Sequence, residues 1–388
     1  MLKIVSIIGA RPQFIKLAAF ARVVNRYFST KLDHKIIHTG QHYDKNMSEV
    51  FFNELQIDVP AYHLSLHTNQ GTFPMRKAVC SIEQILQQEK PDLVIVYGDT
   101  YSTLAGALAA DHCNIALAHI EAGMRSYDQT MPEEVVRVET DKLATYLYCA
   151  TQTAMNNLQK EGVSLNRSKP YHKSNKKIMF SGDLMYDNAL YYAEKISIDT
   201  LALRSFLQHT KELFILTTFH RQHNTDSKEH LQGFVEGLLK IAEKKINILF
   251  PVHPRTRKMF TILLPQEIYQ TFSNHPYIHC VEPLSFLEML YVEKRASLII
   301  TDSGGVQKEA YFFQKPCIIL RSETEWIELL HNKCGLLCDT KADAIAQTYH
   351  YFVQHPPLNF PPVFGKGQAA RYICESILEI LNENISER

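Results

Sequence analysis

The sequence predicts an α/β protein with two doubly wound domains, each a parallel sheet covered by helices on both faces. Three observations support this fold class. Short β-branched runs alternate with amphipathic helical segments along the whole chain. The predicted strands are apolar on both faces, which is typical of parallel sheets buried between helices. The length of 388 residues corresponds to two or three domains of roughly 150 residues each.

The predicted strands form two series, one in each half of the chain. Segments with helical spacing of apolar residues lie between most of them, for example 12–28, 73–88 and 228–245. The polar stretch 162–177, with four lysines, predicts an exposed insertion. The strands are 3–8, 35–39, 93–97, 115–120, 146–150 and 178–181 in the first half, then 213–218, 246–252, 277–281, 297–301, 316–320 and 335–338 in the second.

The pattern places a domain boundary near residue 190. We expect domains at 1–190 and 191–365, followed by a C-terminal helical segment at 366–388. Four prolines in 356–362 interrupt the helical pattern before this last helix. Two doubly wound domains predict a cleft between them, and ligands of such sheets bind outside the carboxyl ends of the strands. Residues that directly follow predicted strands are therefore the candidates for function.

Composition and charge exclude several classes of protein. Forty-one basic residues balance forty-one acidic ones, so no net charge favours a nucleic acid or an anionic membrane as partner. The apolar runs are far shorter than the roughly 20 residues that span a bilayer. Eight cysteines show no metal-binding spacing and are expected to be reduced. A strand directly after the first two residues leaves no room for an export signal, and we expect a cytoplasmic protein.

The first candidate loop, 9–16, reads Gly-Ala-Arg-Pro-Gln-Phe-Ile-Lys and follows the first predicted strand. Gly9 turns the chain, and Pro12 suits the first turn of a helix, where its missing N–H has no cost. Arg11 and Lys16 then flank a helix N-terminus, a combination suited to an anion. A solvated arginine and lysine at an ordinary helix start explain this segment alone equally well.

The strongest signal for phosphate binding is the loop after strand 297–301. It runs through Ser303, Gly304 and Gly305 into a helix. Two glycines let a ligand approach the backbone, and the free N–H groups of the helix start point at it. Glu309 lies further along this helix, where a carboxylate can bind a ribose diol. A helix cap with glycines for close packing explains the same residues without a ligand.

Carboxylates follow two more predicted strands of the first half. Asp99 and Glu121 each come directly after a strand, and Glu133 lies in a helix opened by Pro132, one turn before Arg137. We expect the three carboxylates to converge, and such crowding raises pKa values and prepares acid/base groups. N-cap roles for Asp99 and Glu121, and a surface ion pair between Glu133 and Arg137, explain the same residues without catalysis.

The second half supplies a histidine and two arginines at corresponding places. His220 and Arg221 follow the first strand of this half, and His220 is a candidate general acid/base. Arg321 follows strand 316–320, shortly before Trp326, which is the only tryptophan. We expect Arg321 to line a sugar subsite and the indole to anchor its loop, although a large hydrophobe packing a loop on the core explains Trp326 as well.

Seven motifs occur together in one order along the chain. Together they resemble the non-hydrolysing UDP-N-acetylglucosamine 2-epimerase family, and the resemblance covers essentially the whole chain. It implies two Rossmann-like domains of the kind found in GT-B glycosyltransferases, with a C-terminal helix that crosses back to the first domain. The motifs are GARPQFIK at 9–16, GDTYSTLAGALAA at 98–110, HIEAGMRS at 119–126, MPEEVVR at 131–137, HR at 220–221, PVHPRTR at 251–257 and TDSGGVQKEA at 301–310.

The resemblance also implies the chemistry and the residues that perform it. UDP is eliminated across C1–C2 of the sugar and added again to the 2-acetamidoglucal from the other face, which requires acid/base groups and diphosphate stabilisation but no cofactor and no metal. Arg221 and Arg321 are expected to contact substrate. The implied acid/base groups are Asp99, Glu121, Glu133 and His220, and the implied UDP-binding residues are Arg11, Lys16, Arg137, Ser303, Gly304, Gly305 and Glu309.

Departures from the family pattern leave the exact substrate open. Gln13 stands where many members have glutamate, and the loop at 321–326 reads Arg-Ser-Glu-Thr-Glu-Trp. These motif sequences are similar to those of the branch of the family that acts on UDP-2,3-diacetamido-2,3-dideoxy-glucuronate. The segment 41–44 also departs from the pattern linked to a second, allosteric UDP-GlcNAc. The sequence is compatible, too, with a GT-B glycosyltransferase, a nucleotide-sugar sensor or a hydrolysing relative, and we expect a homodimer.

Overall fold

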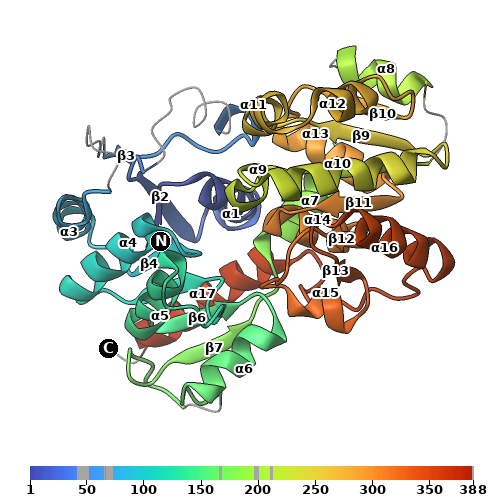
Figure 1. The fold of residues 1–388 in the computed structure, drawn as a ribbon. Helices are drawn as coiled ribbons and strands as arrows, with labels where there is room; N and C mark the ends of the chain where they lie inside the picture. Colours follow the sequence, from blue (N-terminus) through green and yellow to red (C-terminus); the bar gives the residue numbers. More distant parts are fainter. Residues whose placement is uncertain are drawn as a thin grey trace. The chain divides into compact units, whose positions relative to one another are not determined.

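The computed structural model describes residues 1–41, 52–64, 66, 73–165, 168–195, 201–209 and 213–386. The chain divides into two compact units (Figure 1). The first unit comprises Met1–Asn188 and Pro362–Arg388, so the C-terminal segment belongs with the first half of the chain, and the second unit is Ala189–Pro361. The point where the chain passes from the first unit to the second falls inside helix α7 (Leu184–Ala193).

The first unit is built on a seven-stranded parallel sheet with strand order β3-β2-β1-β4-β5-β6-β7. The predicted α/β fold class is confirmed, and β3 is a strand that the sequence did not reveal, because two residues are too short for a periodic pattern. The strands are β1 (Leu2–Ile8), β2 (Leu32–His38), β3 (Tyr62–His63), β4 (Leu93–Tyr97), β5 (Leu117–Ile120), β6 (Tyr146–Cys149) and β7 (Lys177–Phe180).

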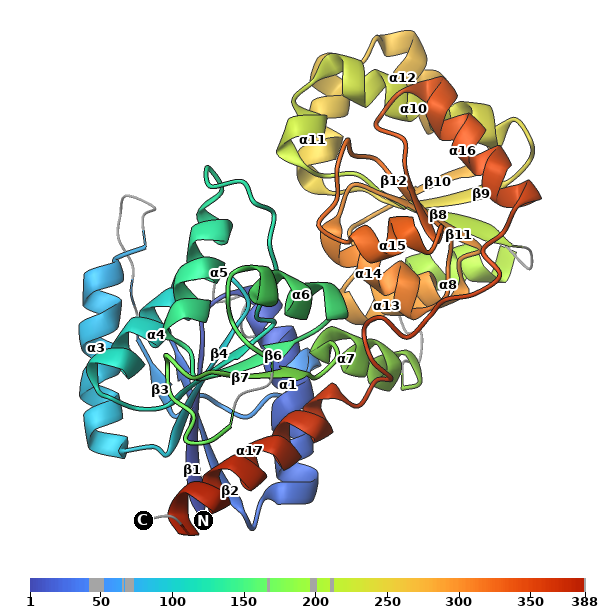
Figure 2. The ribbon, with the colours of Figure 1, turned by 90° about the horizontal axis from the view of Figure 1, so that it is seen from below.

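Helices cover both faces of this sheet. In Figure 2, α3, α4 and α5 lie together on one face, and α1 packs against α17 on the other. Helix α1 continues into a π-helical turn at Val24–Phe28. The remaining bounds are α1 (Arg11–Val23), α3 (Met75–Glu89), α4 (Tyr101–His112), α5 (Pro132–Leu143), α6 (Gln152–Lys160) and α17 (Ala369–Ser386).

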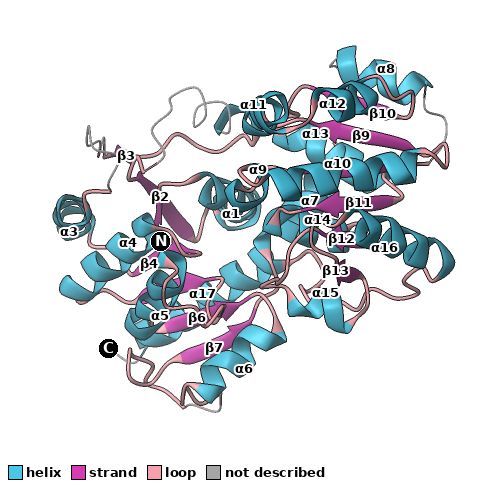
Figure 3. Cartoon of the chain, viewed as in Figure 1, coloured by secondary structure: helices cyan, strands magenta, loops and turns pink. Residues whose placement is uncertain are grey.

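The second unit repeats the architecture with a six-stranded parallel sheet of order β10-β9-β8-β11-β12-β13 (Figure 3). Its strands are β8 (Phe214–Thr218), β9 (Asn247–Pro251), β10 (Ile278–Val281), β11 (Leu298–Thr301), β12 (Cys317–Ile319) and β13 (Gly335–Leu337). Its helices are α8 (Leu201–His209), α9 (Gln222–Thr225), α10 (Lys228–Ala242), α11 (Pro254–Leu263), α12 (Gln266–Ser273), α13 (Phe286–Arg295), α14 (Gly304–Phe312), α15 (Ile327–His331) and α16 (Ala342–Gln354).

The central strands are buried on both faces, as the unbroken apolar runs predict. Every residue of β4, β8 and β11 is buried. Phe219 and Phe234 stack with ring centroids 4.1 Å apart in the core of the second unit. Because these strands have no solvent face, a polar side chain of the same region becomes accessible only where a strand ends.

Strand order reverses once in each sheet, and the reversal selects particular loops. In the first sheet it lies between β1 and β4, and in the second between β8 and β11. The chain leaves these strands at Gly9, Gly98, Phe219 and Asp302. These are the starting points of the loops in which the sequence placed most of its candidate residues, and such reversals are the usual ligand sites of doubly wound sheets.

The C-terminal helix is attached to the first unit by a buried carboxylate. Asp187 accepts hydrogen bonds from the backbone N–H of Ala369 (3.0 Å) and of Ala370 (2.8 Å) in the first turn of α17. Burial raises the pKa of Asp187 to about 6, although both N–H groups act in the opposite direction. Asp183 raises this pKa further, whereas Arg22 lowers it.

We expect Asp187→Asn to reduce the pH dependence of stability. The folded pKa is raised above the ordinary 3.8, so the favourable contribution of the neutral carboxyl is fully present below pH 4 and is lost as pH rises through about 6. Between pH 4 and pH 7 the wild type should lose about 2 kcal/mol of unfolding free energy relative to the variant. Urea denaturation across this range measures the difference. Asp343→Asn, at a largely exposed carboxylate, should leave the slope unchanged, and a parallel slope for Asp187→Asn would contradict the assignment.

In the part of the chain that the structure describes, no helix combines the length and the apolar character needed to cross a membrane. All eight cysteines are free thiols. Burial raises the pKa of several of them, including Cys280 and Cys334 to about 11. These thiols therefore remain protonated at neutral pH.

Candidate active site

Two ion pairs define the carboxyl edge of the first sheet. Lys16 Nζ contacts Glu121 Oε2, and Arg137 Nη2 contacts Asp99 Oδ2. Burial lowers the pKa of Arg137, but Asp99 and Glu121 outweigh it and keep the pKa above its ordinary value. Arg137 therefore lies within electrostatic reach of both carboxylates. The structure thus places each of these two carboxylates beside a cation.

Lys16 is buried, with 5% of its surface exposed, and the loop after β4 is shaped around it. A Cβ added at Gly98 would lie 3.0 Å from Lys16 Nζ, and Gly98 has φ of +61°. Both the left-handed conformation and the close approach of the ammonium favour glycine at this position. The sequence Gly98-Asp99 thus places the lysine and the aspartate at the same strand end.

Neither Asp99 nor Glu121 caps a helix, so the N-cap interpretation is wrong. Thr100 is the N-cap of α4, with its side chain accepting a hydrogen bond from Thr103 N. Glu121 has φ of +72°, an uncommon and costly conformation for a residue with a Cβ. The backbone N–H groups of Glu121 and Ala122 both donate to the carbonyl of Tyr148 at 3.0 Å. The strained turn is held by β6 and directs the Glu121 carboxylate toward Lys16.

The two adjacent glutamates of α5 have different environments. Glu133 is exposed. Glu134 is buried and accepts hydrogen bonds from Ser126 N (2.9 Å) and Tyr127 N (3.0 Å). Burial raises the pKa of Glu134, but these N–H groups outweigh it and lower the pKa. The ion pair of Arg137 on this helix is with Glu134 at 3.2 Å rather than with Glu133, which corrects the surface pair considered from the sequence.

A buried network beneath these loops was not recognised from the sequence. Asp141 contacts His119 Nδ1 at 2.6 Å and Arg125 Nη1 at 2.8 Å, and it accepts a hydrogen bond from Gly123 N at 3.0 Å. The other ring nitrogen of His119 donates to the carbonyl of Gly98 at 2.8 Å. Burial raises the pKa of Asp141, but His119 and Arg125 outweigh it and lower the pKa. The network joins β5, α5 and the loop that carries Asp99.

Gln13 has a definite role in the first loop. Its Oε1 accepts from Gly9 N (2.7 Å) and Ala10 N (3.1 Å), while its Nε2 donates to Tyr97 O (2.9 Å). An amide satisfies both sides of this buried position because it carries an acceptor and a donor. The side chain therefore fixes the start of α1 against the end of β4, next to exposed Arg11.

In the second unit, Asp302 organises the loop that carries the candidate histidine. This fully buried carboxylate accepts hydrogen bonds from the backbone N–H of His220 (3.0 Å) and of Arg221 (2.9 Å). Nδ1 of His220 lies 3.4 Å from Asp302 Oδ1, and the imidazole is 41% exposed. The ring of His253 lies 5.8 Å away between centroids. Asp302 thus joins the loops after β8 and β11 and leaves the His220 ring accessible to a ligand.

The loop before α14 combines a helix cap with an approachable backbone. Ser303 is the N-cap, and its side chain accepts a hydrogen bond from Val306 N. A Cβ at Gly305 would lie 3.8 Å from Ser303 Oγ, an ordinary contact, whereas one at Gly304 would lie 2.7 Å from Glu325 Oε1. The two glycines therefore differ: Gly304 makes room for a carboxylate of the same unit, and Gly305 leaves the helix start open.

Two arginines lie beside this helix start. Arg321 Nη1 pairs with Glu325 Oε2 at 2.7 Å. Burial lowers the pKa of Arg221, and the positive charge of Arg321 lowers it further, so Arg321 is within electrostatic reach of Arg221. Trp326 is buried, with Lys308 Nζ 4.4 Å from its ring centroid. The loop 321–326 therefore packs against α14.

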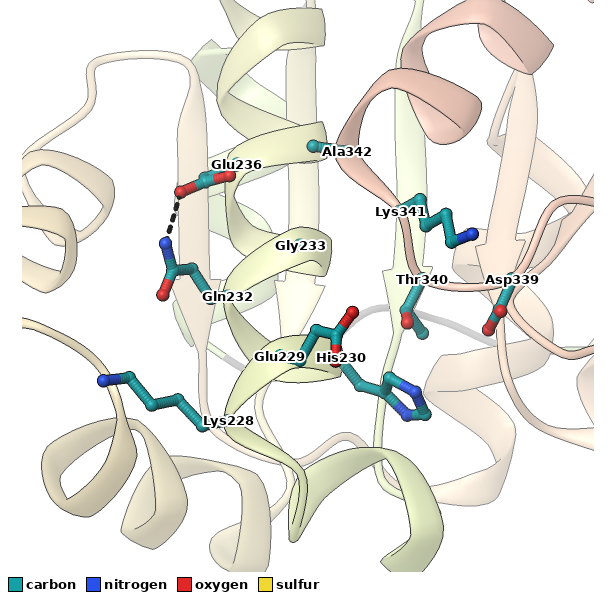
Figure 4. A pocket seen from close by; sticks show the side chains of 10 residues that line it. All are labelled: Lys228, Glu229, His230, Gln232, Gly233, Glu236, Asp339, Thr340, Lys341 and Ala342. Atoms are coloured by element: carbon teal, nitrogen blue, oxygen red, sulfur yellow. Dashed lines mark hydrogen bonds between the residues drawn. The ribbon is translucent and has the colours of Figure 1, made fainter.

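A pocket of about 540 Å³ elsewhere in the second unit contains none of the predicted site residues. Figure 4 shows it between the first turns of α10 and the segment leading into α16. The residues that line this pocket include Gln232, whose side chain donates a hydrogen bond to Glu236 one turn further along α10.

The described residues contain no group of three His, Cys, Asp or Glu side chains arranged to hold a metal ion. Of segment 41–44, only Gln41 is among the described residues, and its Oε1 accepts from Ser102 N.

Comparison with known proteins reveals similarity over nearly the whole chain. The family model described as UDP-N-acetylglucosamine 2-epimerase matches residues 27–378. A UDP-N-acetylglucosamine 2-epimerase homolog of Methanococcus maripaludis is 43% identical over 374 residues, 96% of this chain and 99% of the relative. A UDP-2,3-diacetamido-2,3-dideoxy-D-glucuronate 2-epimerase of Pseudomonas aeruginosa is 38% identical over 380 residues, 98% of this chain and 100% of the relative.

Solved structures extend the similarity to the fold. The crystal structure of Methanocaldococcus jannaschii UDP-GlcNAc 2-epimerase in complex with UDP-GlcNAc and UDP has a TM-score of 0.76 to this chain, with 36% sequence identity. The match covers 97% of this chain and 99% of that one. The two parallel sheets and their helices are therefore of the GT-B-like type that the motifs implied.

Proposed function

Because the chain belongs to the UDP-N-acetylglucosamine 2-epimerase family, we propose that it interconverts UDP-GlcNAc and UDP-ManNAc, as a non-hydrolysing isomerase. The relatives are named as UDP-sugar 2-epimerases, and a solved neighbour holds UDP-GlcNAc and UDP. The observation that carries the proposal is the pair of carboxylates, Asp99 and Glu121, held beside Arg137 and Lys16 at the strand reversal of the first sheet. Proton transfer at C2 requires such groups.

The proposed reaction removes UDP and returns it. A carboxylate takes the proton from C2 as the C1–O bond breaks, which gives 2-acetamidoglucal and UDP. Return of a proton to the opposite face of C2, with addition of UDP at C1, gives the epimer. The cations near the diphosphate stabilise the leaving group, and the acid/base groups act on the two faces of the ring. We assign the proton transfers to Asp99, Glu121, Glu133 and His220.

The residues that we assign to the nucleotide comprise a helix start, a glutamate and several cationic side chains. In the second unit, the open start of α14 at Ser303, Gly304 and Gly305 suits the diphosphate, since its N–H groups and helix dipole attract anions. Glu309 lies on the same helix and is assigned to the ribose hydroxyls. The cationic side chains assigned to the substrate are Arg11, Lys16, Arg137, Arg221 and Arg321.

The alternative substrate is UDP-2,3-diacetamido-2,3-dideoxy-glucuronate. The observation that favours it is the 38% identity to a 2-epimerase of that name, together with the loop Arg-Ser-Glu-Thr-Glu-Trp at 321–326. Arg321 is within electrostatic reach of Arg221, and a sugar carboxylate is a suitable partner for a guanidinium. The same elimination and re-addition apply to either sugar.

Deuterium exchange distinguishes these functions. The protein is incubated with each UDP-sugar in heavy water, and the sugar is followed by NMR. Deuterium at C2 of UDP-GlcNAc together with formation of UDP-ManNAc supports the proposal. Exchange with the diacetamido-glucuronate alone transfers the assignment to that branch. Release of UDP without C2 exchange in either sugar would contradict the epimerase and indicate transfer or hydrolysis.

Trp326 should report binding of the nucleotide by its fluorescence. It is the only tryptophan, and its Nε1 lies 3.7 Å from the position of a Cβ at Gly304. A ligand at the start of α14 changes the surroundings of the indole, so UDP should produce a saturable change in emission. Trp326→Phe should abolish the signal without abolishing binding. Superimposed spectra with and without UDP, while calorimetry shows binding, would remove this loop from the site.

The setting of the reaction is part of the proposal. The protein is assigned to the cytoplasm as a homodimer that supplies an epimerised amino sugar for cell-surface polysaccharide. The eight free thiols are consistent with the reducing conditions of that compartment. Sedimentation at several protein concentrations tests the dimer.

A further inference from the structure

A fully buried glutamate faces the residue assigned to the ribose. Glu293 on α13 has no exposed surface, and α13 packs against α14, which carries Glu309. Besides burial, the nearby Glu309 carboxyl raises the pKa of Glu293, so the two carboxyl groups are neighbours. Neither oxygen of Glu293 finds a donor among the described residues. A buried carboxyl of this kind needs a physical explanation.

Two carboxyl groups can hydrogen bond to each other only if one of them holds a proton. Burial is the main cause that raises the pKa of Glu293 well above its ordinary value, and the charge of Glu309 raises it further. The Cys317 thiol on β12 is also near Glu293, and burial raises its pKa, so it adds no charge at neutral pH. Glu293 is therefore the partner that holds the proton.

Glu309 is placed to use this hydrogen bond. It is 7% exposed, so the residue is largely enclosed and only a small part of it is accessible. A carboxylate has lone pairs for several donors, and one donor from the interior leaves others for a ligand. A fixed carboxylate loses less conformational entropy when it binds than a mobile one does.

We propose that Glu293 is a positioning residue for nucleotide recognition: its protonated carboxyl donates a hydrogen bond to Glu309 and fixes the carboxylate that receives the ribose hydroxyls. This inference rests on the proposed function, in which Glu309 binds the ribose. It predicts that Glu293 affects only ligands with ribose hydroxyls, because the donor acts through Glu309 and touches no ligand itself.

The test compares UDP with 2′,3′-dideoxy-UDP, which lacks both hydroxyls, by calorimetry. Glu293→Met fills the same space without a donor and should weaken UDP binding about tenfold, the scale of a hydrogen bond to a charged group. Binding of the dideoxy ligand should not change. Glu293→Gln keeps a donor and should bind UDP within about twofold of the wild type. Equal losses for both ligands, or wild-type affinity of the Met variant for UDP, would overturn the proposal.

Two further measurements distinguish a failure of this proposal from a failure of the proposed function. Glu309→Gln in the full-length protein should also lose affinity for UDP but not for the dideoxy ligand. If it does not, the ribose role of Glu309 fails and the positioning role of Glu293 fails with it, while C2 exchange still decides the epimerase. As pH rises and Glu293 loses its proton, the preference for UDP over the dideoxy ligand should decline in the wild type but persist in Glu293→Gln. A pH-independent preference in the wild type would contradict the donor role.

Discussion

Replacing Glu121 by glutamine is expected to lower kcat by about 10²-fold or more, while the variant still binds UDP. Glutamine preserves the shape of the side chain but can neither accept nor return the C2 proton. The hydrogen bonds that hold the strained turn come from the backbone N–H groups of residues 121 and 122, so the loop should keep its conformation. Steady-state rates and calorimetry with UDP measure the two quantities separately.

Asp99→Asn and Glu133→Gln are expected to lower kcat on the same scale. Glu139→Gln is the matched control, because Glu139 lies on α5 like Glu133 but forms an exposed ion pair with Lys142. It should retain the wild-type rate. A full rate in all three site variants would refute the assignment, and a full rate in Glu133→Gln alone would restrict the acid/base role to the two carboxylates beside cations.

Replacing Asp141 by alanine is expected to lower the free energy of unfolding by about 3–5 kcal/mol. Arg125 and His119 are almost completely buried, with side chains 1% and 0% exposed. Removal of their shared carboxylate leaves two buried polar groups without that partner, and Gly123 N loses its acceptor. Urea denaturation of variant and wild type at one pH measures the loss.

The exposed pair on the same helix provides the control for stability as well. Glu139→Gln should change the unfolding free energy by less than about 0.5 kcal/mol, because surface ion pairs contribute little. Asp141→Ala should also reduce turnover, since His119 donates to Gly98 beside Asp99. A loss of stability no larger than that of the control would show that the buried network is not a structural support.

Periodicity and local chemistry were sufficient for most of the fold. Twelve predicted strands coincide with strands of the two sheets to within a few residues, because a parallel strand buried on both faces must be apolar throughout. The helix starts after Gly9 and Ser303 were predictable from glycine, proline and capping residues. The two-residue strand β3 was not, since its pairing with β2 is decided by the sheet rather than by its own sequence.

For the candidate site, too, some features could be predicted from the sequence and others are visible only in the structure. Its position after the strands at each reversal followed from the order of the motifs, and so did the residue types that suit a diphosphate. The sequence itself shows two adjacent glutamates at 133 and 134, an unremarkable Asp141 and an ordinary helical Glu293. Only the packed structure distinguishes them, because it buries Glu134 under the N–H groups of Ser126 and Tyr127 and leaves Glu133 exposed.

The strands, the helices and the loops that carry the candidate site could be predicted from the sequence, because these depend on interactions between near neighbours in the chain. The tertiary structure alone decided which charges meet: Lys16 with Glu121, Arg137 with Asp99, and Asp141 with His119. These partners are 22 to 105 positions apart in the chain. Their pairing depends on how strands are ordered in the sheet and on which side chains lose water, and both are properties of the packed unit rather than of any segment.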